Sequence, residues 1–462
     1  MAKLKSLTKK ISYSLAANVV SVAASLLVTV AVPKFFAEDI ASYGYYQVFV
    51  FYVVYIGFLH LGWCDGILLR DAGREYGKLD KRLYSGQFWL LTGAEIVISI
   101  IVAIAGMIFS PDAAYQYIWV LIAANILLSI PKYMLSYTLQ ATGRVKEYSV
   151  MTALGKAVYI FTVMIVLVSG VRDFKLFILA WTIGEAVSLI VAIAYCRDIV
   201  FSKLCGIRDA AIEGRNNIQV GIKLLFANIA GLLITGIVRF AVQTGFDIET
   251  YGKISFTLTV TNMFLTFMSA IELVLFPILK QKDIAELKRV YSKIHKYLML
   301  GLFGCMIAYY PVELILNMWI PSYSDAVRYV AILFPVCVFS SKMSLLVQNY
   351  MKVFRMEKQI MLVNVAGVVI AVITAAISVG CLHNLSLAMF AIVFNHMFRC
   401  VAAEILLGKK SGIRVMKDII PEMLMAMAFV TAMWFIGGWV GTAMYLAAFV
   451  GYSVLSLRFQ VE

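Results

Sequence analysis

The sequence predicts an all-α polytopic membrane protein with about 14 transmembrane helices, and its composition, its series of apolar runs and an internal repeat support that fold class. Of the 462 residues, 62% are hydrophobic and only 14% are charged, whereas soluble domains carry about 25% charged residues. Fourteen spans of about 20 residues would use nearly all of the apolar positions. The composition therefore excludes a secreted disulfide scaffold, a nucleic-acid factor and a soluble enzyme.

Fourteen apolar runs follow one another along the chain, separated by Gly or Pro breaks or by short charged loops. They cover 12–33, 44–66, 84–109, 115–140, 149–169, 175–196, 218–243, 251–276, 294–316, 326–351, 359–380, 385–407, 419–437 and 440–457. The first run follows a lysine-rich start but is too long for a signal peptide, so we expect a retained first helix. The loops are too short to fold as a catalytic domain, so the sequence predicts no enzyme.

The distribution of Lys and Arg predicts the orientation. If the N-terminus is cytoplasmic, 29 of the 40 basic residues fall in cytoplasmic segments and 4 in the opposite loops. Cytoplasmic loops of membrane proteins carry such an excess. We therefore expect a multi-pass membrane protein with both termini in the cytoplasm.

The two halves of the chain resemble each other at a nearly fixed offset. Tyr43-Gly44 recurs as Tyr251-Gly252 after 208 residues, and the loop 81–85 (KRLYS) recurs at 288–292 (KRVYS) after 207 residues. The offset spans six runs, an even number, so both copies keep the same orientation. This predicts two parallel six-helix bundles, 1–210 and 211–410, related by a pseudo-two-fold axis along the membrane normal, followed by two additional helices in 411–462.

Polar residues form stripes on three predicted spans. Spans one, seven and eight carry Ser, Thr and Asn at helical spacing, which places each set on one face. We interpret them as the lining of a shared water-filled cavity, with Asn18, Ser25, Asn228, Asn262 and Thr266 as lining residues. Helix–helix packing through small polar side chains is the alternative.

Several basic residues lie deep within predicted spans, four of them about 12 Å from the cytoplasmic end at 1.5 Å per residue. Because a charge facing lipid at that depth is costly, we expect a cationic cavity that binds an anionic phosphate or pyrophosphate head group. The substrate-binding candidates are Arg239, Lys132, Lys156, Lys342 and Arg399. Structural ion pairs are the alternative.

Three glutamates within the spans are the candidate acidic partners: Glu95, Glu185 and Glu272. They either couple transport to a proton or sodium gradient or neutralise the lysines. The seven cysteines and four histidines show no metal-ligand spacing, so we predict no metal and no cofactor. The segment 277–296 carries apolar residues on one face and many lysines elsewhere, which predicts an interfacial helix on the cytoplasmic leaflet.

Several segments resemble a known group of transporters. They are 61–66 (LGWCDG) with Arg70, 139–144 (LQATGR), 237–240 (IVRF) with Tyr251-Gly252, and Pro277 with Lys280. They are similar to segments of the Wzx-type O-antigen and capsule oligosaccharide flippases, in the polysaccharide-exporter branch of the multidrug/oligosaccharidyl-lipid/polysaccharide exporter superfamily. Val238 stands where that family commonly has Asp, which puts any role of that position in doubt.

The resemblance implies a flippase that moves a lipid-linked oligosaccharide repeat unit, on an undecaprenyl-pyrophosphate carrier, from the cytoplasmic to the outer leaflet. The pathway would be polysaccharide biosynthesis of lipopolysaccharide O-antigen, capsule or exopolysaccharide, and the location the resemblance implies is the bacterial cytoplasmic (inner) membrane. Expected partners are this lipid, membrane lipids, and the glycan polymerase and glycosyltransferases of the same pathway, with no nucleic acid. The alternatives are a cation-coupled multidrug exporter of the same superfamily, a membrane glycan polymerase or ligase, and a scaffold without transport activity.

Overall fold

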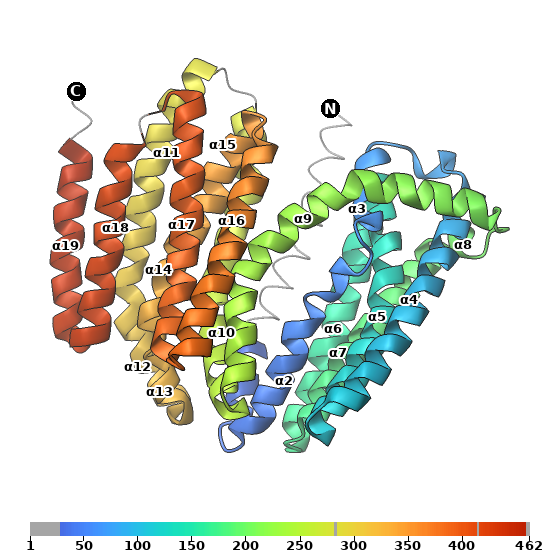
Figure 1. The fold of residues 1–462 in the computed structure, drawn as a ribbon, viewed down its shortest axis with the longest axis horizontal. Coiled ribbons are helices and arrows are strands. Elements are labelled where there is room, and N and C mark those ends of the chain that lie inside the picture. Colours follow the sequence, from blue (N-terminus) through green and yellow to red (C-terminus); the bar gives the residue numbers. More distant parts are fainter. Residues whose placement is uncertain (1–27, 281–283, 414, 459–462) are drawn as a thin grey trace. The chain divides into compact units, whose positions relative to one another are not determined.

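The structure, a computed structural model, describes the backbone of residues 28–280, 284–413 and 415–458; side chains are described for these residues except 227, 266–280, 284, 285, 288, 289, 457 and 458. The described residues form helices and contain no strand (Figure 1). Contacts divide the chain into an N-terminal unit, Met1–Ile229, and a C-terminal unit, Ala230–Glu462.

Twelve helices of the described part are long and apolar enough to cross a membrane. A further helix, α10, runs over 33 residues, Ile248–Lys280, which is about 50 Å at 1.5 Å per residue. Most of the predicted first span lies in 1–27, outside the described residues, and 28–35 are helical. The all-α polytopic fold class is therefore confirmed.

The N-terminal unit is built around one central helix. Its elements are α2 (Ile40–Val53), η1 (Ile56–Phe58), α3 (Trp63–Arg70), η2 (Tyr76–Lys78), α4 (Lys81–Phe109), α5 (Ala113–Ala141), α6 (Val145–Ser169), α7 (Phe174–Tyr195), α8 (Arg197–Val200) and the first part of α9 (Ile207–Gly245). Helix α5 packs against α2, α3, α4, α6 and α7. The Asp112 side chain caps it by accepting from the Tyr115 amide, and its apolar residues at fourfold spacing, such as Ile122, Ile126 and Ile130, are buried.

The C-terminal unit has the same plan around α14. After the rest of α9 come α10 and then α11 (Ile284–Cys305), η3 (Met306–Ala308), α12 (Tyr309–Trp319), η4 (Pro321–Tyr323), α13 (Ser324–Val327), α14 (Val330–Lys342), η5 (Met343–Val347), α15 (Gln348–Val353), α16 (Glu357–Ala375), η6 (Ala376–Cys381), α17 (Leu385–Ser411), α18 (Met416–Val430), η7 (Thr431–Ile436) and α19 (Gly438–Arg458). Helix α14 packs against α10, α11, α17 and α18. The span 330–353 is 83% buried within the protein, against 61% for α5 and 50% or less for the other candidate spans.

One predicted feature is corrected by the packing of α11. The apolar face of 277–296 was expected to lie on the membrane surface, but Leu287 and Tyr291 are only 1% and 2% exposed and belong to a core cluster with Tyr350 and Leu407. The apolar face is therefore covered by the protein itself, and the interfacial-helix interpretation is wrong for the described part of this segment.

Candidate functional site

The N-terminal unit contains a cavity of about 330 Å³ between α5, α6 and α7. That volume lies at the small end of the roughly 300–1,000 Å³ typical of ligand pockets. The lining combines charged, hydroxyl and aromatic side chains: Lys132, Tyr133, Ser136, Tyr148, Met151, Thr152, Lys156, Tyr159, Ile160, Trp181, Glu185 and Ser188, with Gly155 and Gly184. Three of the residues that the sequence singled out, Lys132, Lys156 and Glu185, therefore meet in one place.

Lys132 and Glu185 form an ion pair across the cavity wall. The Lys132 ammonium donates to Glu185 Oε2, which also accepts a hydrogen bond from the Ser129 hydroxyl at 3.0 Å. The side chains are 10% and 21% exposed. Each charge has therefore lost most of its water but has gained a partner, which is the arrangement that a partly buried pair requires.

Lys156 gives the cavity a second cation. The lining contains two lysines and one carboxylate, so with Lys132 and Glu185 paired the cavity keeps one positive charge. Within the described part of the chain, Lys156 has no hydrogen bond or ion pair. This charge is available to an anionic group that enters the cavity.

The wall of the cavity is closely packed and aromatic. A Cβ atom placed on Gly184 would lie 2.7 Å from the Gly155 carbonyl oxygen, so α6 and α7 cross with their backbones almost in contact. Trp181 and Tyr159 stack edge to face with their ring centres 5.3 Å apart. The indole nitrogen of Trp181 is buried and has no hydrogen-bond partner among the described residues, so it can donate to a ligand.

In the C-terminal unit, Lys342 occupies a closed ionic centre instead of a cavity. Its ammonium donates to Glu404 Oε2 at 2.5 Å and to Glu422 Oε2 at 2.6 Å. Both carboxylates are buried, as is Lys342 at 1% exposed. Tyr291 donates to the other oxygen of Glu404 at 2.8 Å. Contact between Lys342 and an anionic head group would require breaking both ion pairs, so the ammonium is not available to a ligand in this arrangement.

The two lysine sites are related by the internal repeat. Lys132 and Lys342 are 210 residues apart, in line with the offsets of the repeated motifs, and each lies in the most buried span of its unit. Glu185 and Glu404 both come from the last helix of the corresponding six-helix bundle. The sites also differ: the first lines a cavity that contains Lys156, whereas α18, which lies outside the repeat, adds Glu422 to the second.

The remaining basic candidates belong to the C-terminal unit and are not among the residues that line the cavity. Arg399 donates from Nε to Asn364 Oδ1 at 2.8 Å, and Arg239 lies with its guanidinium carbon 5.5 Å from the centre of the Tyr251 ring. His396 bridges two helices through Thr235 at 2.8 Å and Ser340 at 2.9 Å. Thr235, part of the polar stripe on span seven, therefore serves helix packing.

The structure places the other predicted residues as follows. Asn228 and Asn262 are exposed on α9 and α10, and Glu95 is buried at 1% exposed on α4 with Oε2 unpartnered among the described atoms. Asn18 and Ser25 lie outside the described residues, as do the side chains of Thr266 and Glu272.

The sequence analysis did not identify Glu404, Glu422 and His295 as neighbours of Lys342. The available signal was the presence of two carboxylates inside the apolar runs 385–407 and 419–437.

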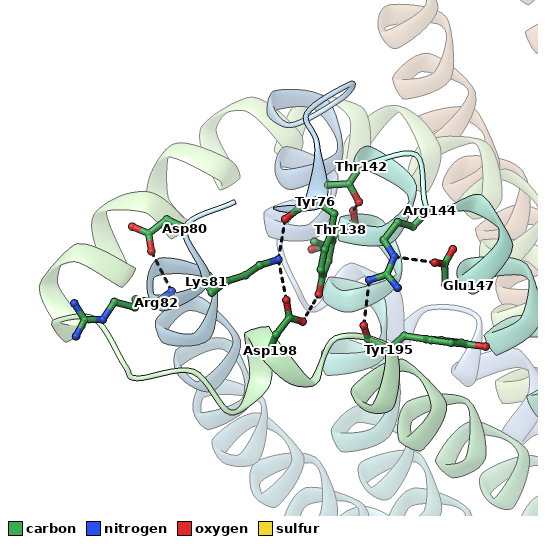
Figure 2. A network of polar contacts seen from close by, with 10 residues as sticks. All are labelled: Tyr76, Asp80, Lys81, Arg82, Thr138, Thr142, Arg144, Glu147, Tyr195 and Asp198. Atoms are coloured by element: carbon green, nitrogen blue, oxygen red, sulfur yellow. Dashed lines mark hydrogen bonds and ion pairs between the residues drawn. The ribbon is translucent and has the colours of Figure 1, made fainter. Parts of the chain in front are cut away.

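A second polar network holds the predicted cytoplasmic end of the N-terminal unit together (Figure 2). Tyr76 donates to Asp198 Oδ1 at 2.7 Å, and Lys81 lies 3.2 Å from Asp198 Oδ2. Arg144 donates to Glu147 at 2.9 Å and to the Tyr195 carbonyl at 3.2 Å, and its guanidinium lies over the Tyr76 ring at 4.4 Å. The network connects η2, α4, α6, α7 and α8, which are distant in sequence.

Comparison with known proteins shows the fold. No family model and no curated protein sequence matches the chain. Among solved structures, the chain is similar to a lipid II flippase MurJ in an inward closed conformation, with a TM-score of 0.65 and 11% identity over 98% of this chain and 100% of that one. It is also similar to an inward-facing multidrug resistance MATE family transporter of the MOP superfamily, with a TM-score of 0.57 and 13% identity over 86% and 98% of the two chains. At these identities the likeness concerns the fold, and the chain is a multi-pass membrane protein with the fold of MOP superfamily transporters.

Proposed function

We propose that this protein is a flippase that moves a lipid-(pyro)phosphate-linked oligosaccharide repeat unit from the cytoplasmic to the outer leaflet by alternating access. The main observation behind the proposal is the cavity of the N-terminal unit. Lys132 and Glu185 form an ion pair there, so the positive charge of Lys156 gives the lining a net charge of one. An ammonium group forms strong charge-assisted hydrogen bonds with phosphate oxygens. The full-length likeness to a lipid II flippase supports the same class of substrate.

The chemistry of the wall suits a carbohydrate attached to the phosphate. Trp181, Tyr148 and Tyr159 offer aromatic faces, while Ser136, Thr152 and Ser188 offer hydroxyl groups. Aromatic rings with a polar tip bind groups that are partly apolar and partly hydrogen bonding, as sugars are. The phosphate would occupy the cavity, and the lipid tail would remain in the bilayer. Undecaprenyl is the proposed carrier, and surface polysaccharide assembly the proposed pathway.

The proposed test measures transport in proteoliposomes that contain a fluorescent prenyl-pyrophosphate oligosaccharide. A membrane-impermeant quencher reports the fraction of this lipid in the outer leaflet. Lys156→Ala should reduce the transport rate about tenfold or more, because one charge-assisted hydrogen bond is worth about 1.5–3 kcal/mol. Lys156→Arg should retain most of the activity. Lys203→Ala, at an exposed lysine of the loop before α9, is the matched control. Equal rates in Lys156→Ala and Lys203→Ala would contradict the proposed site.

A multidrug exporter is the second candidate, favoured by the similarity to a MATE transporter. The surplus lysine opposes it, since a cationic drug would be repelled from the cavity. A transport assay with a cationic dye in the same proteoliposomes separates the two functions. Accumulation of the dye without movement of the prenyl-pyrophosphate lipid would replace the flippase proposal by the exporter.

A further inference from the structure

The closed ionic centre of the C-terminal unit carries more negative than positive charge unless it also holds a proton. Lys342 contributes one positive charge, and Glu404 and Glu422 contribute two negative charges. All three side chains are at most 2% exposed. Arg399, a further buried cation on α17, donates to Asn364 and forms no ion pair with either carboxylate among the described residues. A buried charge without a partner is costly, so the three groups in direct contact are balanced when one more proton is bound.

The position of His295 indicates where this proton resides. Its Nε2 lies 2.7 Å from Glu422 Oε1, and neither atom makes a hydrogen bond within the described part of the chain. An imidazole nitrogen and a carboxylate oxygen repel each other at this distance unless a proton lies between them. The same nitrogen is 3.8 Å from Glu404 Oε1, so it lies beside both buried carboxylates.

The other ring nitrogen of His295 faces a route to solvent. Nδ1 lies 4.0 Å from Asp418 Oδ2, about one ångström longer than a hydrogen bond. The Asp418 side chain is 47% exposed, whereas that of His295 is 6% exposed. His295 thus stands between an exposed carboxylate and two buried ones. An imidazole can accept a proton at one nitrogen and release another from the opposite nitrogen.

We propose that the centre formed by Lys342, Glu404, Glu422 and His295 is a proton-binding site of the C-terminal unit, connected to solvent through Asp418. A proton moves from Asp418 to Nδ1 of His295, and the proton on Nε2 passes to Glu422; release follows the reverse path, and no other bond changes. The inference does not depend on the transported substrate. It uses none of the three glutamates that the sequence suggested for ion coupling.

The site connects the repeat to the additional helices. Lys342 lies on α14, His295 on α11, Glu404 on α17 and Glu422 on α18. Gain or loss of the proton therefore changes the attraction between α18 and the six-helix bundle. The titratable and charged groups around the centre are Tyr291 and His295 from α11, Lys342 from α14, Arg399, Cys400 and Glu404 from α17, Lys417, Asp418 and Glu422 from α18, and Tyr452 from α19.

The experiment is a pH titration by NMR of the full-length protein in nanodiscs with isotope-labelled histidine. The chain has four histidines, so the spectrum of His295→Gln assigns the His295 signal. In Glu422→Gln, His295 should bind its proton at least tenfold more weakly than in the wild type. The exposed His383 serves as the internal control and should titrate identically in both proteins. An unchanged His295 titration in Glu422→Gln would overturn the proposal.

A second variant covers the case in which Glu422→Gln does not fold. Asp418→Asn changes a half-exposed side chain and should leave the fold intact. It should slow proton exchange between His295 and solvent several-fold, which line widths near the midpoint of the titration report. Unchanged exchange in Asp418→Asn would exclude the proposed route. Lipid transport in the same variants is measured separately, so failure of the flippase proposal leaves these results interpretable.

Discussion

At the scale of single residues, the network around Asp198 shows how a partly buried carboxylate at the end of a helix bundle is kept in its charged form. Burial raises the pKa of Asp198, but the hydrogen bonds from Tyr76 and Lys81 outweigh burial and hold the pKa below its ordinary value of 3.8. Because the folded protein holds this carboxylate in its charged form more strongly than the unfolded chain does, the network adds stability above the unfolded pKa. This contribution is lost as the pH falls through the folded pKa.

We therefore predict a pH-dependent difference between the wild type and Asp198→Asn. The wild type should be more stable by at most about 1 kcal/mol at neutral pH, since the Asp198 side chain is 49% exposed. The difference should be constant down to about pH 5 and shrink below about pH 4. Thermal unfolding of both proteins across this range measures it. A difference that grows on acidification would contradict the assigned role of the carboxylate.

At the scale of elements, the apolar runs predicted most helices to within a few residues. Helical segments that mix polar and apolar residues were not predicted, because they do not form an apolar run. Helix α5 covers 113–141 where the sequence predicted 115–140. Helix α9, however, begins at Ile207 and not near 218. Its first turns carry exposed polar residues on one side, among them Arg208, Asp209 and Arg215. On the side that packs on protein, Asn217 is 2% exposed, accepts from Arg70 at 2.5 Å and donates to Gln87 at 2.8 Å. A helix that faces protein on one side and water on the other lacks the signal of a membrane span.

The crossing of α3 and α9 also explains the segment 61–66, which the sequence singled out only by resemblance. Gly62 has a φ of +87°, a conformation that favours glycine. A Cβ atom on Gly221 would lie 2.0 Å from the Gly62 carbonyl oxygen, and one on Gly66 would lie 2.0 Å from the Asn217 carbonyl oxygen. The two backbones therefore touch along a row of glycines, and small residues are required for this contact.

This contact predicts that Gly221→Val destabilises the N-terminal unit. The added side chain meets backbone and cannot be accommodated by rotation of a neighbour, so the cost should be about 1–3 kcal/mol or more. Gly77→Ala is the matched control, because nothing lies within 4 Å of a Cβ atom at Gly77, and it should be nearly neutral. The thermal unfolding temperature of the purified variants measures both effects; similar values would show that α3 and α9 separate easily.

At the scale of the whole molecule, the internal repeat predicts equivalent positions but does not predict what they do. The sequence indicated deep lysines and left open whether they line a cavity or form ion pairs. The structure shows both outcomes: Lys132 pairs beside a cavity, whereas Lys342 lies between two carboxylates. Ion pairs between residues 53 to 80 positions apart depend on which helices become neighbours, and the order of apolar runs does not specify this. The asymmetry arises from α18, which has no counterpart in the first repeat.

The last prediction follows from this asymmetry: the repeat-related substitutions Lys132→Met and Lys342→Met should have unequal effects. Lys342→Met leaves Glu404 and Glu422 facing each other, both at most 2% exposed, and breaking such a buried arrangement costs about 3–5 kcal/mol. Lys132→Met leaves Glu185, which is 21% exposed, keeps its hydrogen bond from Ser129 and shares the cavity with Lys156. The remaining lysine compensates for the lost charge.

Thermal unfolding in detergent, followed by tryptophan fluorescence, should therefore show at least a twofold larger decrease in unfolding temperature for Lys342→Met than for Lys132→Met. The double variant Lys342→Met/Glu422→Gln should recover part of the loss, because it removes one of the two facing carboxylates. Equal decreases for the two single variants would mean that the C-terminal centre is no more dependent on its lysine than the open site. Its charge would then be balanced by something other than the pairs seen here, and the assignment of a single stored proton to this centre would have to be abandoned.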